Sequence, residues 1–239
     1  FVGLVLISSA AASFGKDAFY PTQPMETAIT AGDVDGDGDI DLVSGGDHDN
    51  GTILRSNGDG SFAPASTFSH DGQIKSIAIG EFTGDDSADL AVGNNFSLQI
   101  FKGDGSGTFG PDPEPGSPGA YASAKSFAAT DLNGDGITDF VTVSVQVEVW
   151  MGNGDGTFDP PTGFAANGAP DSVAVGDLNG DSKPDLAVAN GDSHDVSILL
   201  GNGDGSFAPA VNHPLDDNLE IPYFSFSPDM SIVVGDFNR

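Results

Sequence analysis

The chain of 239 residues contains no cysteine, only seven lysine and arginine residues, and one tryptophan. The absence of cysteine excludes disulfide bonds and thiol catalysis, although it does not fix the compartment. Against the seven basic residues stand 36 acidic ones, for a formal net charge of -29. Such a surface repels phosphates and anionic lipid, so we expect no nucleic acid partner. Beyond the amino end, no apolar run is long enough to insert into a membrane.

The amino end combines an apolar run over residues 1–7 with the small residues that follow it. Ala10 and Ala12 fit the small-x-small pattern of a cleavage site, which predicts that residues 1–12 are the end of a signal peptide. The alternative is a decayed copy of the strand and turn at residues 198–207.

Five aspartates occur within the nine residues "DVDGDGDID", from Asp33 to Asp41, with no basic residue near them. Crowded carboxylates resist ionisation, so a folded chain keeps them only where a cation or solvent neutralises the cluster. Calcium prefers oxygen ligands and tolerates flexible geometry, and it fits side chains at loop positions 1, 3, 5 and 9 with the carbonyl at position 7. The alternative is an acidic surface turn that binds no ion.

The acidic loop recurs along the chain. Its four complete copies are loop 1 (33–41), loop 2 (81–89), loop 3 (131–139) and loop 4 (177–185), which begin 46 to 50 residues apart, and a fifth copy begins at Asp236. A Gly-Asp-Gly motif keeps the same step and ends in an aromatic residue: Phe62, Phe109, Phe158 and Phe207. Two interleaved motifs with one period identify a structural repeat.

The segments between the motifs alternate or run apolar with β-branched residues, as in "SIAIG" (76–80) and "VEVWMG" (147–152). Each repeat therefore predicts four strands A to D, with the acidic loop between A and B and the glycine hairpin between C and D. Strand D is expected to begin at the phenylalanine. Four short antiparallel strands per repeat are typical of a β-propeller blade, so the predicted fold class is all-β, with the four phenylalanines buried between blades.

Two other calcium motifs do not fit. An EF-hand needs flanking helices and a glutamate at position 12, where this chain has Ser44, Val92, Thr142 and Val188. The nonapeptide β-roll has a repeat that is far too short.

The pairing of D-x-[DN]-G-D-x-x-x-D with a following "GDGTF" resembles the FG-GAP or VCBS repeats of integrin α-subunit propellers and of secreted bacterial proteins. The resemblance covers residues 13–239. It implies calcium ligands in the acidic loops, with the seventh residue contributing its carbonyl. The implied ligands are Asp33, Asp35, Asp37, Asp39 and Asp41; Glu81, Thr83, Asp85, Ser87 and Asp89; Asp131, Asn133, Asp135, Ile137 and Asp139; Asp177, Asn179, Asp181, Lys183 and Asp185; and, in the incomplete fifth loop, Asp236 and Asn238.

Loop 2 departs from the family pattern, because Glu81 is longer than aspartate and Thr83 is neutral. We therefore expect the affinity order loop 1, loop 3, loop 4, loop 2. Asp86 and Ser182 stand where loops 1 and 3 have glycine, and we expect a conformational cost there.

Four complete repeats and the start of a fifth predict a piece of a larger propeller, with seven blades as one candidate number. The resemblance implies that a protein or glycan ligand binds on the face opposite the acidic loops. The four histidines, His48, His70, His194 and His213, map to connections on that face. An unusually long stretch that includes residues 215–226 is a second candidate contact surface, or a loop that packs over the rim.

The sequence contains no nucleophile elbow, P-loop or HExxH motif, so we expect no enzyme activity. The resulting interpretation is a calcium-binding extracellular scaffold for adhesion or ligand binding, secreted or at the cell surface. The alternative is a carbohydrate-active propeller of the lectin or polysaccharide lyase type.

Overall fold

The computed structural model describes residues 26–46, 50–70, 72–93, 98–111, 126–215 and 232–235. In these ranges the chain forms sixteen strands and no helix, which confirms the all-β class. Since the described part has no helix, it also has none that could cross a membrane. The predicted signal peptide, Asp236 and Asn238, His48, and all but the first residue of the 215–226 stretch lie outside the described residues.

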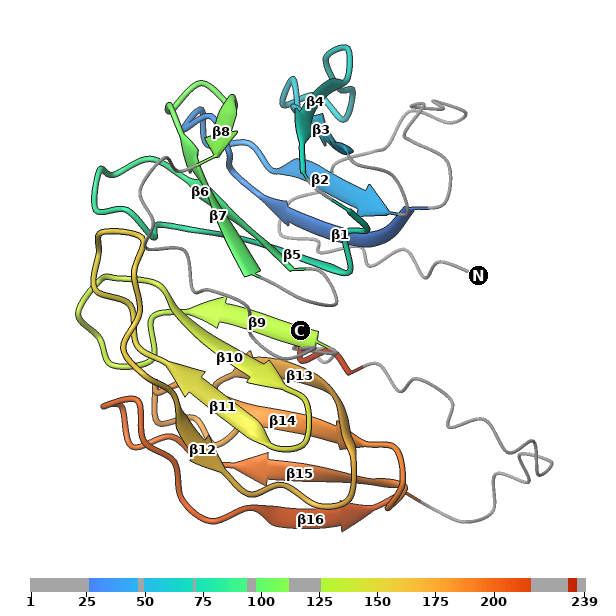
Figure 1. Ribbon diagram of the computed structural model, residues 1–239, viewed down its shortest axis with the longest axis vertical. Helices are drawn as coiled ribbons and strands as arrows, with labels where there is room; N and C mark the ends of the chain where they lie inside the picture. Colours follow the sequence, from blue (N-terminus) through green and yellow to red (C-terminus); the bar gives the residue numbers. More distant parts are fainter. Residues whose placement is uncertain are drawn as a thin grey trace, which may run out of the picture. The chain divides into compact units, whose positions relative to one another are not determined.

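The strands form four separate antiparallel sheets of four, each in chain order, as a propeller blade requires (Figure 1). The chain divides into two compact units, with two sheets in each. The strands of the first unit are β1 (Glu26–Gly32), β2 (Asp41–Gly46), β3 (Asn50–Leu54), β4 (Ser66–Ser69), β5 (Ser76–Gly80), β6 (Asp89–Gly93), β7 (Leu98–Gly103) and β8 (Phe109–Pro111). Those of the second unit are β9 (Ser126–Thr130), β10 (Asp139–Val143), β11 (Val147–Trp150), β12 (Thr162–Phe164), β13 (Pro170–Gly176), β14 (Asp185–Asn190), β15 (Asp195–Leu199) and β16 (Val211–Pro214).

The second strand of every sheet carries the apolar core. All residues of β6, β10 and β14 are buried, and β2 has a single half-buried position. These strands have sheet neighbours on both sides, and the mostly apolar residues that follow their first aspartate, such as "LAVG" of β6, suit burial on both faces. In the first unit Val43, Leu90 and Phe101 meet in one cluster, and in the second unit Val141, Leu186 and Leu199 do the same.

The fourth strand begins later than the sequence predicts in three sheets. Phe62, Phe158 and Phe207 pair only as isolated bridges, and β4, β12 and β16 start four residues further on. Prolines follow each of these phenylalanines within three residues, and proline cannot donate to the ladder. In the second sheet β8 starts at Phe109 as predicted, although Pro111 follows Phe109 at a similar spacing and ends the strand, so proline alone does not account for the difference.

Burial of the repeated phenylalanines is confirmed for two and wrong for two. Phe109 and Phe207 are each 8% exposed and belong to the core clusters of their units. Phe62 and Phe158 are half-buried and belong to neither cluster. The difference depends on which sheet carries the phenylalanine. Phe109 and Phe207 lie in the second sheet of their units and pack against the core that this sheet shares with the first sheet.

Candidate metal centres

Each acidic loop curls through two residues with left-handed backbone, at its fourth and sixth positions. In loop 1 these are Gly36 and Gly38, with φ of 76° and 89°. Loops 2 and 4 instead have Asp86 and Ser182 at the sixth position, both with φ of 65°. A residue with a Cβ costs roughly 1–2 kcal/mol in this region, so the strained conformation predicted for these two residues is confirmed.

The first carboxylate of the loop holds this curl. Asp131 Oδ1 accepts a hydrogen bond from the Gly134 N–H at 2.7 Å, and its Oδ2 accepts one from the Gly136 N–H at 2.9 Å. Asp33 and Asp177 bind the N–H groups of their own fourth and sixth residues at the same two distances. Backbone donors thus fix the first candidate ligand of loops 1, 3 and 4.

The third and fifth side chains accept backbone bonds as well. Asp37 Oδ1 accepts the Asp39 N–H at 2.8 Å, and Asp135 Oδ1 accepts the Ile137 N–H at 2.8 Å. Asn133 Oδ1 accepts the Asp135 N–H at 2.9 Å. A carboxylate has four lone-pair sites and an amide oxygen two, so these bonds orient the oxygens and leave capacity for a metal.

Loop 1 brings three carboxylates together. Asp33, Asp35 and Asp37 each offer an oxygen within 4.8 Å of the others. Asp35 Oδ1 is buried and has no hydrogen-bond partner. Burial raises the pKa of Asp35 above its ordinary value, and the carboxylates of Asp41, Asp37 and Asp33 raise it further. An orphaned, desolvated carboxylate oxygen beside two others is the donor set that a hard cation satisfies.

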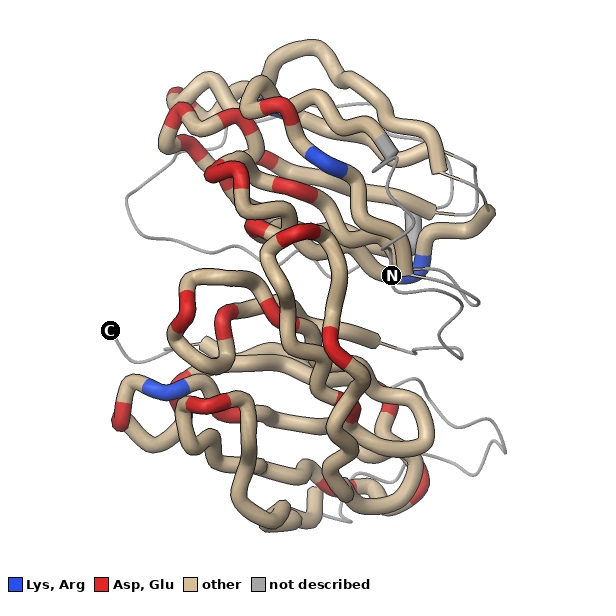
Figure 2. Tube along the Cα trace, turned by 60° about the vertical axis from the view of Figure 1, so that its left-hand side comes forward, with Lys and Arg blue, Asp and Glu red and all other residues tan. Residues whose placement is uncertain are grey.

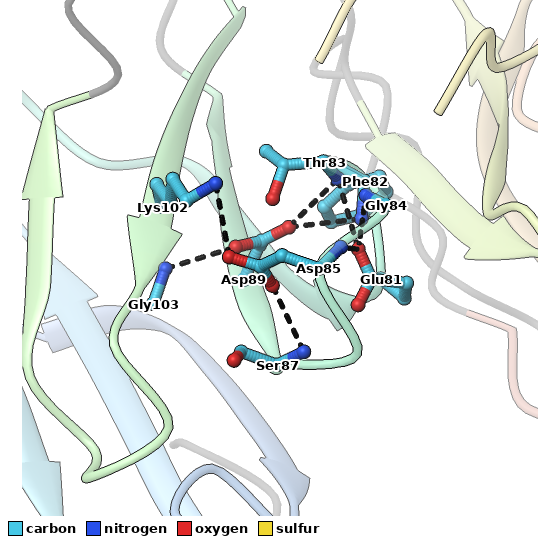
Figure 3. Close-up of polar contacts among 9 residues, drawn as sticks. All are labelled: Glu81, Phe82, Thr83, Gly84, Asp85, Ser87, Asp89, Lys102 and Gly103. Carbon is cyan, nitrogen blue, oxygen red and sulfur yellow. Dashed lines mark hydrogen bonds and ion pairs between the residues drawn. The ribbon is translucent and has the colours of Figure 1, made fainter. Parts of the chain in front are cut away.

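Loop 2 keeps the backbone contacts of its first carboxylate and adds a contact with a lysine (Figure 3). Glu81 Oε1 accepts hydrogen bonds from the N–H groups of Thr83, Gly84 and Asp85, at 3.0, 2.6 and 3.3 Å. Asp85 Oδ2 lies 2.9 Å from the Lys102 ammonium, and this contact is the main cause that lowers the pKa of Asp85. The extra methylene of Glu81 is accommodated, because the carboxylate still reaches the backbone donors of the curl.

The ninth residue of each loop is the first residue of the second strand and is wholly buried: Asp41, Asp89, Asp139 and Asp185 are all 0% exposed. One oxygen accepts the N–H of the loop's second residue at 2.8 to 2.9 Å, and the other accepts an N–H at the start of the glycine hairpin at 2.7 to 2.9 Å. Each of these aspartates therefore ties its acidic loop to the hairpin beside it.

The hairpin donor was not recognised from the sequence. It is glycine in three sheets, Gly103, Gly152 and Gly201. A Cβ on these residues would lie 2.0 to 2.6 Å from the carbonyl oxygen of the loop's eighth residue, so glycine permits the close approach. The recurring glycine directly before each of these hairpins was the available signal.

The glycine hairpins add four further carboxylates at the same end of the sheets. Asp59, Asp104, Asp155 and Asp204 each accept bonds from the hydroxyl and the N–H of the residue two positions later. These hydroxyl and backbone bonds lower the pKa of all four groups. Figure 2 shows the acidic residues of the first unit gathered at one end of its sheets.

The opposite end of the fourth sheet holds a different polar cluster. The Asp195 carboxylate, 5% exposed, accepts hydrogen bonds from the side chains of Asn190, Ser193 and Asn167. His194 beside it adopts a φ of 50°. Strained backbone of this kind persists only where surrounding contacts hold it.

The histidines predicted for this end divide between loop and strand. His70 follows β4 and His194 precedes β15, as predicted for connections. His213 lies within β16, so its predicted place in a loop is wrong, because the ladder to β15 extends through Pro214. Among the described residues, the only group of three or more candidate metal-binding side chains is the Asp33 triad, which contains no histidine.

Comparison with protein families gives four consecutive matches to the FG-GAP-like repeat, over residues 33–92, 82–142, 131–188 and 179–239. Each match begins at, or within two residues of, the start of an acidic loop. A search of curated proteins finds no match to this chain.

Among solved structures, the chain is similar to an Agrocybe aegerita lectin that recognises non-reducing terminal N-acetylglucosamine. Identity is 26% and the TM-score is 0.56, with 76% of this chain and 50% of the lectin covered. The chain is also similar to BBS1N in its complex with ARL6DN, at 15% identity and a TM-score of 0.56, covering 86% and 63% of the two chains. The chain thus spans about half of the lectin and under two thirds of BBS1N.

The two classes of perturbed aspartate predict a stability maximum in acid. In metal-free buffer, burial raises the pKa of Asp35, Asp89 and Asp139, so their protonation favours folding as the pH falls from 7. The lowered pKa of the hairpin aspartates, such as Asp59, gives stability that is present above the ordinary value of about 3.9 and lost below it. We expect the melting temperature to rise on acidification and to fall below about pH 4.

Two variants test the rise and the fall of the melting temperature separately. Asp35→Asn should flatten the rise, and Asp59→Asn should weaken the fall below pH 4. A melting temperature that declines steadily from pH 7 downward would contradict the assignment.

Proposed function

Since the chain belongs to the FG-GAP-like repeat family, we propose that it is a calcium-stabilised, extracytoplasmic β-propeller scaffold that binds a protein or glycan ligand. The observation that carries the calcium assignment is the Asp33, Asp35 and Asp37 triad with its orphaned Asp35 oxygen. Bound calcium would neutralise the charge and take the free lone pairs.

The donor sets of loops 3 and 4 fit the same ion. Each offers oxygen ligands from side chains that backbone hydrogen bonds already orient, together with the carbonyl of the seventh residue. Calcium accepts six to eight such oxygens at flexible distances, whereas magnesium requires a near-octahedral arrangement and retains its waters. Calcium is therefore the ion that these loops would select.

Charge sets the proposed order of affinity. Loop 1 has five aspartates. At the third loop position, where loop 1 has Asp35, loops 3 and 4 have Asn133 and Asn179, which keep an oxygen and lose a charge. Ser182 adds backbone strain to loop 4. Loop 2 has neutral Thr83 and comes last, so the order is loop 1, loop 3, loop 4, loop 2.

Occupied sites would contribute substantially to folding. Extracellular modules bind calcium with dissociation constants of roughly 0.1 to 1 mM. At a dissociation constant of about 0.1 mM and about 1 mM free calcium, linkage gives about 1.4 kcal/mol per site. Several sites of this size are a large share of a typical net stability of about 5 to 15 kcal/mol. These affinities suit a calcium-rich setting outside the cytoplasm.

Removal of calcium is the direct test of the metal assignment. Excess chelator should lower the melting temperature, and magnesium should restore little of it. Asp135→Ala should reduce the calcium stoichiometry by one, because loop 3 then lacks a fixed carboxylate between Asn133 and the Ile137 carbonyl. A melting curve that chelator leaves unchanged would contradict the proposal.

The ligand is assigned to the end of the sheets opposite the acidic loops. Support comes from the buried polar cluster around Asp195, which holds the connections of the fourth sheet in one conformation. Fixed hydrogen-bonding groups at loop ends are suited to recognise a polyhydroxylated ligand. We propose no catalytic role. The alternative is a carbohydrate-active propeller, and the likeness to a lectin favours binding over cleavage within that alternative.

A glycan array in about 1 mM calcium, a concentration set by the extracellular range of affinities, tests the glycan branch. It should include glycans that end in N-acetylglucosamine. We expect wild-type protein to retain a defined subset of glycans intact, and Asp195→Asn to lose them because its single amide oxygen cannot accept both from Asn167 and from Asn190 and Ser193. Asp192→Asn, at an exposed site nearby, is the matched control. Retention of no glycan would leave the protein branch, and release of shortened glycans would contradict the non-enzymatic role.

A further inference from the structure

Loop 2 already contains a cation supplied by the chain itself. Lys102 stands at the end of β7, one residue before the hairpin donor Gly103, and its Nζ lies 2.9 Å from Asp85 Oδ2. Asp85 is the fifth residue of loop 2, the position that holds a proposed metal ligand in every loop. Figure 3 shows the lysine reaching toward the carboxylates of the loop from the neighbouring strand.

In the other three sheets the residue before the hairpin donor is not a lysine. The residue before the hairpin donor is Arg55, Met151 or Leu200 in sheets one, three and four. The Arg55 guanidinium donates to the Ser106 carbonyl oxygen of the next hairpin at 3.0 Å instead. Met151 contacts Gly205 of the next hairpin. In the part of the chain that the structure describes, Lys102 is the only one of these four residues that forms an ion pair with an acidic loop of the same sheet.

Loop 2 also carries fewer candidate metal ligands with a negative charge than loop 1. Its third residue is neutral Thr83, where loop 1 has Asp35. A tethered ammonium also acts at a high effective concentration, because its binding to Asp85 is intramolecular.

We propose that the Lys102 ammonium takes the place of the metal ion in loop 2. The inference rests on the proposed calcium binding of the other loops. It predicts that Lys102 lowers by one the number of calcium ions that the chain binds. A divalent ion entering loop 2 must break the ion pair and lie beside a fixed positive charge. Removing that charge should raise the calcium affinity of loop 2 by about a hundredfold or more, as expected for a unit charge about 4 Å from a dication near a protein surface.

The test is calcium stoichiometry, measured by equilibrium dialysis and calorimetry at about 1 mM free calcium, within the extracellular affinity range. Lys102→Met, which copies the residue of the third sheet, should bind one more ion than wild type. Lys75→Met removes the same charge from the connection before β5, and it should leave the stoichiometry unchanged. Adding Asp85→Asn to Lys102→Met should abolish the extra ion, because the unmasked site then lacks its fifth-position carboxylate.

The outcomes distinguish this inference from the proposed function. Wild type that binds calcium, with Lys102→Met binding the same number of ions, overturns the inference and leaves the calcium proposal standing. Wild type that loses one ion through Asp85→Asn alone also overturns it, because loop 2 would then be occupied despite the lysine. Wild type that binds no calcium overturns both. Melting curves in chelator show whether each variant is folded, so that a changed stoichiometry is not mistaken for unfolding.

Discussion

The structure depends on one buried carboxylate per sheet, the aspartate that begins the second strand. Asp139 shows the arrangement: it is 0% exposed, and its two oxygens accept the N–H groups of Leu132 and Gly152 at 2.8 Å each. Burial raises its pKa, and the two backbone donors act in the opposite direction. The hydrogen bonds between the strands do not join the acidic loop to the glycine hairpin. The aspartate joins them, and so fixes both at one end of the sheet.

That constraint concentrates charge. Because the loop and the hairpin are held together, their remaining carboxylates gather at the same end, and the fold has to supply neutralisation there. Backbone N–H groups orient most of the side chains, but loop 1 still leaves Asp35 Oδ1 buried without a partner. Two kinds of cation answer this demand in our account, a bound calcium ion in loops 1, 3 and 4 and the Lys102 ammonium in loop 2. Both lower the same repulsion, and they differ in whether the cation comes from solution or from the chain.

Sequence periodicity predicted the sheets and the loops, because strand alternation and the glycine positions are local signals. The left-handed residues Asp86 and Ser182 were found by comparing loops with each other. Phe62 and Phe158 were mispredicted because burial depends on which sheet packs against them, which a repeat pattern does not encode. The Lys102–Asp85 pair was missed because its partners are 17 residues apart, with Asp85 in the loop before β6 and Lys102 on β7, and only the register of β6 with β7 brings them together.

The most direct test of the central claim is amide hydrogen exchange together with the free energy of unfolding for Asp139→Asn in calcium-free buffer. The variant keeps the shape of the side chain, but its amide group faces one of the two backbone donors. Our account predicts a loss of about 1–3 kcal/mol and reduced protection of the Leu132 or Gly152 amide. Asp192→Asn, an exposed change in the same unit, should stay within about 0.5 kcal/mol of wild type. Unchanged stability and unchanged protection of both amides in Asp139→Asn would contradict the claim.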